Sequence, residues 1–122
     1  MDFLINNWWL LLIILATALI IFKTFSVFNK PNNNIQKFIE DGAIIIDVRS
    51  ESEFKSGNIE NSINVPLKDL MYRVNEFNKE KKYVTVCAAG VRAESAKKFF
   101  ERKGFQVLNG GRWTTIKDLK NK

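Results

Sequence analysis

The chain contains no histidine and a single cysteine among its 122 residues. One cysteine cannot form a disulfide within the chain. The absence of histidine excludes a histidine-based catalytic triad, a Cys–His protease pair and a zinc site built on imidazole. Any chemistry must therefore come from Cys87, carboxylates, lysines, arginines, hydroxyls or backbone amides.

The length leaves room for one small domain and little else. Apolar residues make up 46% of the chain and charged residues 26%, with a formal net charge of +6. The charges are well scattered, which argues against a disordered or low-complexity chain. Many of the apolar residues are concentrated near the N-terminus, however, so the remainder can build only a modest core.

Residues 3–22 are apolar except for two asparagines and one threonine. As a helix this stretch would be about 30 Å long, which matches the hydrocarbon core of a bilayer. Trp8 and Trp9 stand near one end, where aromatic rings favour the membrane interface. We therefore predict a single transmembrane anchor with a juxtamembrane linker over residues 1–30. A cleaved signal peptide is less compatible with the pattern, because no basic residue precedes the stretch. A buried soluble helix is also less compatible, because apolar residues lie on every face of the helix.

The charges that flank this stretch predict its orientation. Lys23 and Lys30 follow it and Lys37 lies a little further on, whereas only Asp2 and the terminal amine precede it. The positive-inside rule then places the C-terminal part in the cytoplasm. A lone cysteine agrees with that placement, because a reducing compartment keeps it as a thiol.

Residues 31–122 form the second predicted domain, after a linker at residues 29–34. Short apolar runs that predict strands alternate with amphipathic segments that predict helices. The expected strands are 43–48, 63–65, 83–86 and 105–108. The expected helices are 35–39, 50–55, 67–77, 93–103 and 113–119, and a turn is expected at Gly110 and Gly111. This alternation indicates an α/β fold with a mainly parallel sheet, whose ligands bind at the carboxyl ends of the strands.

Cys87 follows one of these predicted strands directly, and a loop of small residues leads from it into a helix. Backbone N–H groups of such a loop can converge as an anion-binding nest, and the helix adds the positive end of its dipole. A cysteine in that position is expected to be held in its nucleophilic thiolate form. The alternative is that Cys87 is a small buried hydrophobic residue without a chemical role. The candidate site consists of Cys87 and the loop residues Ala88, Ala89, Gly90, Val91, Arg92 and Ala93.

Four segments in order resemble the signatures of single-domain rhodaneses, the thiosulfate-type sulfurtransferases. Two of them are Asp47-Val48-Arg49 with Glu53-Phe54, and Gly57 to Pro66, which is similar to the motif G-H-I-x-G-A-x-N-x-P. The others are Cys87 to Arg92, which resembles C-x-x-G-x-R, and Gly104-Phe105-Gln106-Val107 with Gly110, Gly111 and Trp113. Asn58 and Asn61 depart from the motif's histidine and second glycine. The resemblance implies a three-layer rhodanese-like domain, which follows the predicted membrane anchor in the sequence.

The resemblance also implies a mechanism. Cys87 attacks the outer sulfur of a small anionic donor, thiosulfate or a persulfide, and a thiol or cyanide then removes the sulfur from the resulting persulfide. The loop amides stabilise the anionic sulfur, and no metal or cofactor is required. Arg92 either orients the donor or braces the loop. Asp47 and Arg49 either support the site or form an ion pair that braces the scaffold. Ala88 and Ala89 stand where some thiosulfate-using members carry basic residues, which argues against efficient thiosulfate turnover.

Two other functions fit the same pattern. A non-catalytic persulfide carrier or binding module tethered to the membrane would need the same loop. A cysteine phosphatase is disfavoured, because the related phosphatase loop has five residues between cysteine and arginine and this loop has four.

The basic C-terminal region suits anionic lipid headgroups or solvent better than nucleic acid, since no aromatic–basic platform accompanies it. The sequence identifies no protein partner.

Overall fold

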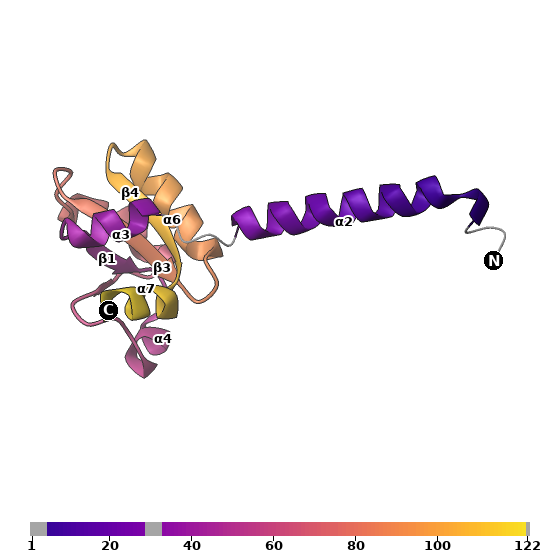
Figure 1. The fold of residues 1–122 in the computed structure, drawn as a ribbon. Coiled ribbons are helices and arrows are strands. Elements are labelled where there is room, and N and C mark those ends of the chain that lie inside the picture. The colour runs from indigo at the N-terminus through magenta and orange to yellow at the C-terminus, as the bar shows by residue number, and fades with distance from the viewer. Residues whose placement is uncertain (1–4, 29–32, 122) are drawn as a thin grey trace. The chain divides into compact units, whose positions relative to one another are not determined.

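The computed structural model describes residues 5–28 and 33–121 (Figure 1). The chain divides into two compact units, residues 1–31 and 32–122, and each is treated by itself. The predicted domain boundary and most of the predicted linker lie outside the described residues. The last two positions of that linker, Asn33 and Asn34, already belong to a helix.

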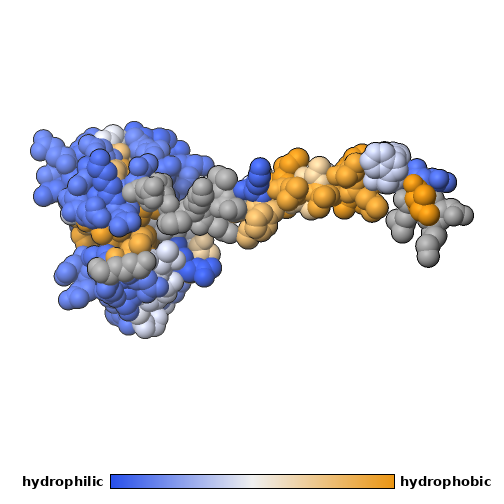
Figure 2. All heavy atoms as spheres, in the orientation of Figure 1, coloured by the Kyte–Doolittle hydropathy of each residue, from blue (hydrophilic) through white to orange (hydrophobic). Residues whose placement is uncertain are grey.

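The N-terminal unit contains one long apolar helix, α2 (Trp8–Phe28). Its most apolar window, Trp8–Phe25, has a mean hydropathy of 2.2, and none of that window is buried inside the structure. Thr17 and Thr24 donate their hydroxyl hydrogens to the carbonyls of Ile14 and Ile21, so neither hydroxyl is left unsatisfied along the apolar surface. By length and composition α2 could cross a membrane, and its apolar surface is plain in Figure 2.

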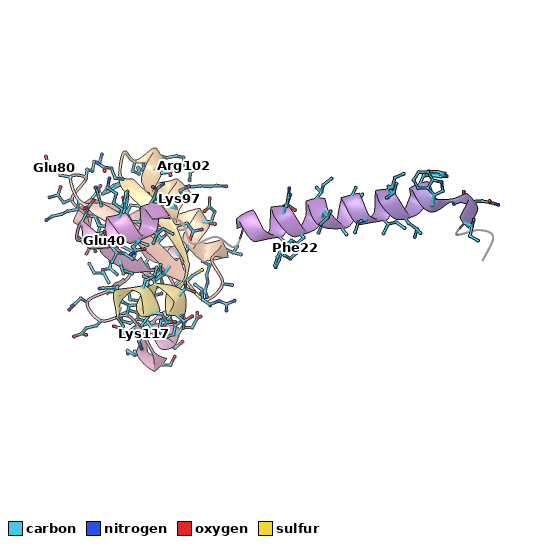
Figure 3. All side chains as sticks on the ribbon, in the orientation of Figure 1. Phe22, Glu40, Glu80, Lys97, Arg102 and Lys117 are labelled. Carbon is cyan, nitrogen blue, oxygen red and sulfur yellow. The ribbon has the colours of Figure 1, made fainter. Side chains whose placement is uncertain are left out.

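The limits of this helix differ from the expected span of 3–22. The helix begins at Trp8 and continues past Phe22, whose exposed ring points away from the backbone in Figure 3, to Phe28. Residues 3 and 4 lie outside the described part of the chain. The helix includes Lys23, because one lysine does not interrupt the backbone hydrogen bonding of a strong helix-forming sequence.

The second unit is built on a four-stranded parallel sheet with the order β2-β1-β3-β4. Its strands are β1 (Ile44–Asp47), β2 (Ile63–Asn64), β3 (Lys82–Cys87) and β4 (Gln106–Arg112). The central strands β1 and β3 are nearly continuous apolar runs, as expected for strands covered on both faces. The predicted α/β class with a mainly parallel sheet is confirmed.

Helices cover both faces of this sheet and produce three layers (Figure 1). Side chains alternate between the faces, so Val84 and Val86 pack in one core while Tyr83 and Cys87 pack in the other. The first core lies under α3 (Asn33–Glu40) and α7 (Trp113–Lys120). The second lies under α6 (Val91–Arg102) and contains Phe100 stacked with Tyr83. Exposed charged residues such as Glu80, Arg102 and Lys117 point outward (Figure 3).

Two local predictions were wrong. The expected helix at 67–77 is broken into a 3₁₀ turn η1 (Leu67–Asp69), the short helix α5 (Leu70–Arg73) and a second 3₁₀ turn η2 (Val74–Glu76). The change of helical pitch alters which side chains face the core. Leu70 and Val74 are buried as expected, whereas Met71 is 68% exposed.

The turn expected at Gly110 and Gly111 is absent from the described structure, because β4 continues through both residues to Arg112. The pairing with β3 shifts by one residue, so Thr85 faces Asn109 and Val86 faces Gly111, which leaves Gly110 as the extra residue of a β-bulge. A Cβ atom at Gly110 would lie 2.7 Å from Val84 Cγ1. Close packing across the sheet thus explains this glycine.

Candidate functional site

Cys87 is the last residue of β3, and the loop that follows it turns through Gly90 into α6. Gly90 has φ of 102°, a left-handed conformation that a side chain would strain, and an added Cβ would also lie 3.4 Å from the backbone of Gly111. The helix begins at Val91, two residues earlier than expected. Arg92 and Ala93 therefore lie in its first turn, and the loop between strand and helix is short.

The sulfur of Cys87 lies inside this loop and accepts hydrogen bonds from its backbone. The Gly90 amide donates to Sγ at 2.9 Å and the Ala93 amide at 3.4 Å. Cys87 itself is 1% exposed, while Ala88 and Ala89 are exposed above it. Two N–H dipoles thus point at a buried sulfur atom, an arrangement that stabilises negative charge on sulfur.

Asn109 of β4 holds the loop from the neighbouring strand. Its amide nitrogen donates to the Gly90 carbonyl at 3.3 Å and to the Glu94 carboxylate at 2.8 Å, while its oxygen accepts from the Gly111 amide at 2.8 Å. Sequence analysis missed this residue. Its position directly before the paired glycines was the available signal, but only the pairing of β3 with β4 brings it to the loop.

Arg92 is bound to Glu53 of α4 (Glu51–Ser56). Its two terminal nitrogens donate to the two carboxylate oxygens at 2.8 and 3.1 Å. Glu53 also accepts from the backbone and side chain of Ser50 in a capping box at the start of α4. The bond from Arg92, followed by those from Ser50, lowers the pKa of Glu53 to about 2. The pairing with Glu53 in turn raises the pKa of Arg92, with a smaller contribution from Cys87.

Asp47 and Arg49 form a buried ion pair with each other. The Arg49 Nη2 atom lies 2.8 Å from Asp47 Oδ2, and the two side chains are 4% and 0% exposed. Arg49 also donates to the Gly57 carbonyl at 2.6 Å, and its guanidinium stacks 4.3 Å from the ring centre of Trp113. The pair therefore connects the end of β1 to the end of α4 and the start of α7, with no exposed charge directed toward a ligand.

A pocket of about 320 Å³ has Arg92 as the residue that it shares with the candidate site. Val48 lies on its wall and donates its amide hydrogen to the carbonyl of Val86, the residue before Cys87. Sequence analysis missed the part of the wall that lies between β2 and α5. The lining residues are Val48, Ser50, Glu51, Pro66, Leu67, Lys68, Asp69 and Arg92.

The model of the rhodanese-like domain family matches residues 32–113, about two thirds of the chain. The chain belongs to this family. This confirms the resemblance inferred from the four sequence segments. It also accounts for the three-layer fold and for a cysteine loop at the carboxyl edge of the sheet.

Several known proteins are similar in sequence to this rhodanese-like chain. It is 29% identical over 65 residues to "Putative sulfurtransferase YtwF" of Bacillus subtilis, covering 53% of this chain and 63% of that protein. It is 31% identical over 106 residues to tRNA uridine(34) hydroxylase of Pelagibacter ubique, covering 77% and 35%. It is 32% identical over 76 residues to "Putative sulfur carrier protein YrkF" of Bacillus subtilis, covering 61% and 41%. The chain thus spans less than two thirds of each of these relatives.

Among solved structures, a rhodanese-like domain protein from Staphylococcus aureus superposes with a TM-score of 0.53. It is 34% identical, and the match covers 57% of this chain and 70% of that one. The relatives carry sulfurtransferase, sulfur carrier and hydroxylase names, so membership of the rhodanese-like family does not by itself specify a reaction.

The two departures from the rhodanese motif have structural explanations. Asn58, in place of the histidine, donates its side-chain amide to the Phe54 carbonyl at 2.9 Å and ties the end of α4 to the next segment. Asn61, in place of the glycine, has φ of 66°. Asparagine tolerates this left-handed conformation better than other residues with a side chain, so the backbone turn is preserved.

Metal chemistry receives no support from the described side chains. Within residues 5–28 and 33–121, no group of three or more cysteine, aspartate or glutamate side chains could hold a metal ion. Two acidic residues near the loop are engaged by other groups, since Glu53 binds Arg92 and Glu94 accepts from the Asn109 amide.

Proposed function

We propose that this rhodanese-like domain is a sulfurtransferase that carries sulfane sulfur on Cys87 as a persulfide. The observation that supports this most directly is the pair of amides, from Gly90 and Ala93, that donate to the Cys87 sulfur. A loop that stabilises a thiolate also stabilises the terminal sulfur anion of a persulfide. The sulfurtransferase and sulfur carrier names of relatives agree with this proposal.

The reaction proceeds by two displacements. The Cys87 thiolate attacks the outer sulfur of the donor, the bond between the donor's sulfur atoms breaks, and the leaving group departs with its electron pair. An acceptor thiol or cyanide then attacks the outer sulfur of the Cys87 persulfide and regenerates the thiolate. Arg92 braces the loop in this scheme, because both its terminal nitrogens are bound to Glu53 rather than free for a donor anion.

Intact-protein mass spectrometry tests the proposal. After incubation with a sulfane sulfur donor, the wild-type chain should gain the mass of one sulfur atom, and Cys87→Ser should gain none. Cyanide should remove the added sulfur as thiocyanate. Failure of Cys87 to acquire sulfur from any donor would reject the proposal, and release of phosphate from an aryl phosphate would favour the phosphatase alternative.

The low exposure of Cys87 favours one alternative function, a persulfide carrier that serves a specific partner. A buried persulfide would be protected from small acceptors in solution. The two functions differ in turnover: an enzyme releases thiocyanate repeatedly in the presence of donor and cyanide. A carrier acquires one sulfur per chain but releases it slowly to cyanide.

We also propose that α2 anchors the domain to a membrane with the domain in the cytoplasm. The exposed apolar surface of α2 and its basic C-terminal flank support this arrangement. Expression of the full chain followed by membrane fractionation should recover it with the membranes after a high-salt wash. Protease added to intact cells should leave the domain uncut, and cleavage under those conditions would reverse the proposed orientation.

A further inference from the structure

One buried polar side chain of the domain has no part in the contacts described so far. Within residues 5–28 and 33–121, the buried polar or charged residues are Asp47, Arg49 and Thr85. Asp47 and Arg49 bind each other, which accounts for their burial. Thr85 is 0% exposed in the middle of the apolar strand β3, where a valine would avoid the cost of burying a hydroxyl. The partner of this hydroxyl therefore bears on its role.

The hydroxyl of Thr85 binds a residue whose amide binds the sulfur of Cys87. Thr85 Oγ1 donates to the Ala93 carbonyl at 2.9 Å, while the Ala93 amide donates to Cys87 Sγ at 3.4 Å. Thr85 and Cys87 are two residues apart on β3, so their side chains lie on the same face of the sheet. The strand thus holds Ala93 at two points, by its carbonyl and by its amide.

The Thr85 bond adds to the backbone bonding of α6. The Ala93 carbonyl belongs to the first turn of this helix, where a helical carbonyl accepts from the amide four residues later. The hydroxyl also lies 3.5 Å from the Leu108 carbonyl, a longer contact than the one to Ala93. Because the helix already supplies a partner for the Ala93 carbonyl, the main effect of the hydroxyl is to fix the first turn of α6 on the sheet.

A second side chain at the same level of the sheet acts on the other amide. Thr85 pairs in register with Asn109 of β4, and the pairing shifts by one residue directly after Thr85. Asn109 donates to the carbonyl of Gly90, whose amide donates to the Cys87 sulfur at 2.9 Å. Both residues that donate to the sulfur are therefore held by their carbonyls, and the two side chains that hold them form one cross-strand pair.

From these contacts we infer that Thr85 is a positioning residue for Cys87, which holds the Ala93 amide within donating distance of the sulfur. This inference rests on the proposed function. Thr85 acts through the backbone of Ala93 rather than on the sulfur directly. Loss of its hydroxyl would let the first turn of α6 move away from the sulfur, and a displaced donor stabilises an anionic sulfur less than a preorganised one.

The test measures sulfur loading of Cys87 on the full chain by mass spectrometry, with thiosulfate and cysteine persulfide as probes. Thr85→Val removes the hydroxyl and keeps the shape of the side chain. At saturating probe its loading should slow about fivefold, as expected for one lost hydrogen bond, with an unchanged half-saturating concentration. Thr85→Ser restores the hydroxyl and should recover most of the rate. Tyr83→Phe is the matched control, because it removes a hydroxyl that donates to the Asn78 carbonyl at 2.8 Å near the other end of β3, and it should load normally.

A spectroscopic measurement separates positioning from a general loss of stability. In protein that circular dichroism shows to be folded, the amide proton resonance of Ala93 should shift in Thr85→Val and return toward its wild-type position in Thr85→Ser. Thr85→Ala is a second variant without the hydroxyl, and it should load as slowly as Thr85→Val. If the valine variant does not fold, the alanine variant decides the outcome.

The outcomes separate this inference from the proposed function. Wild-type loading by the variants without the hydroxyl, or no recovery in Thr85→Ser, would overturn the positioning role while leaving Cys87 as the sulfur carrier. Equal slowing by Tyr83→Phe would also overturn it, because any hydroxyl lost from β3 would then have the same effect. Failure of the wild-type chain to acquire sulfur from either probe would instead reject the proposed function.

Discussion

Arg92 of the cysteine loop and Glu53 of α4 are 39 residues apart in sequence, yet they form a bidentate ion pair, with nitrogen–oxygen distances of 2.8 and 3.1 Å. Glu53 is also the third residue of α4, where it completes the capping box with the N-cap residue Ser50. A single carboxylate therefore connects the start of one helix to the first turn of another. This connection holds the loop that carries Cys87 against the rest of the domain.

The Glu53 carboxylate should make the free energy of unfolding depend on pH. Its pKa is lowered from 4.5 to about 2 in the folded protein, so the unfolded chain binds a proton more readily. Its stabilising contribution is fully present above pH 4.5 and is lost as the pH falls from 4.5 toward 2. Urea unfolding across that range should show a steeper loss of stability for wild type than for Glu53→Gln. Equal slopes would show that the ion pair does not contribute in solution.

Gly90→Ala should impair both stability and sulfur loading. The left-handed backbone at Gly90 disfavours a side chain, and relaxing it would move the amide that donates to Cys87. We expect a loss of about 1–2 kcal/mol in the free energy of unfolding, together with slow loading of Cys87. Gly104→Ala is the matched control, because Gly104 has a similar φ of 92°, open space around it and no contact with the loop. It should lose comparable stability and keep normal loading.

Removal of Arg49 should destabilise the domain strongly. Arg49→Met would leave the Asp47 carboxylate buried without its cation, which costs about 3–5 kcal/mol. The double variant Asp47→Asn with Arg49→Met should recover part of that loss, because no charge then remains buried. Chemical denaturation measures the free energy of unfolding of the single and the double variant. A single variant as stable as wild type would contradict the bracing role of this pair.

Asn109→Asp should loosen the cysteine loop with little change in size. A carboxylate cannot donate to the Gly90 carbonyl, and it would repel Glu94, which the amide now contacts at 2.8 Å. We expect sulfur loading of Cys87 to slow about tenfold. Asn75→Asp, at an exposed position on η2, introduces the same charge away from the loop and should load normally. Normal loading by Asn109→Asp would show that the loop does not need this support.

Alkylation should report the burial of Cys87. With 1% of the residue exposed, the native protein should react with iodoacetamide far more slowly than the urea-unfolded chain. A bulky maleimide should be excluded more strongly still. Mass spectrometry of both reactions gives the rates, and equal reactivity in native and unfolded protein would show that the loop is open in solution.

Local sequence patterns predict the parallel sheet, the cysteine at the end of a strand and the small-residue loop. These features depend on local patterns: apolar runs long enough for buried strands, and a glycine where the backbone must turn. Four other features appear only in the folded domain: Arg92 binds Glu53, Asn109 contacts the loop, β4 passes through its glycines as a bulge, and Lys68 and Asp69 line a pocket. Those contacts join segments through the strand order β2-β1-β3-β4, and the spacing of residues along a chain does not encode which strands become neighbours.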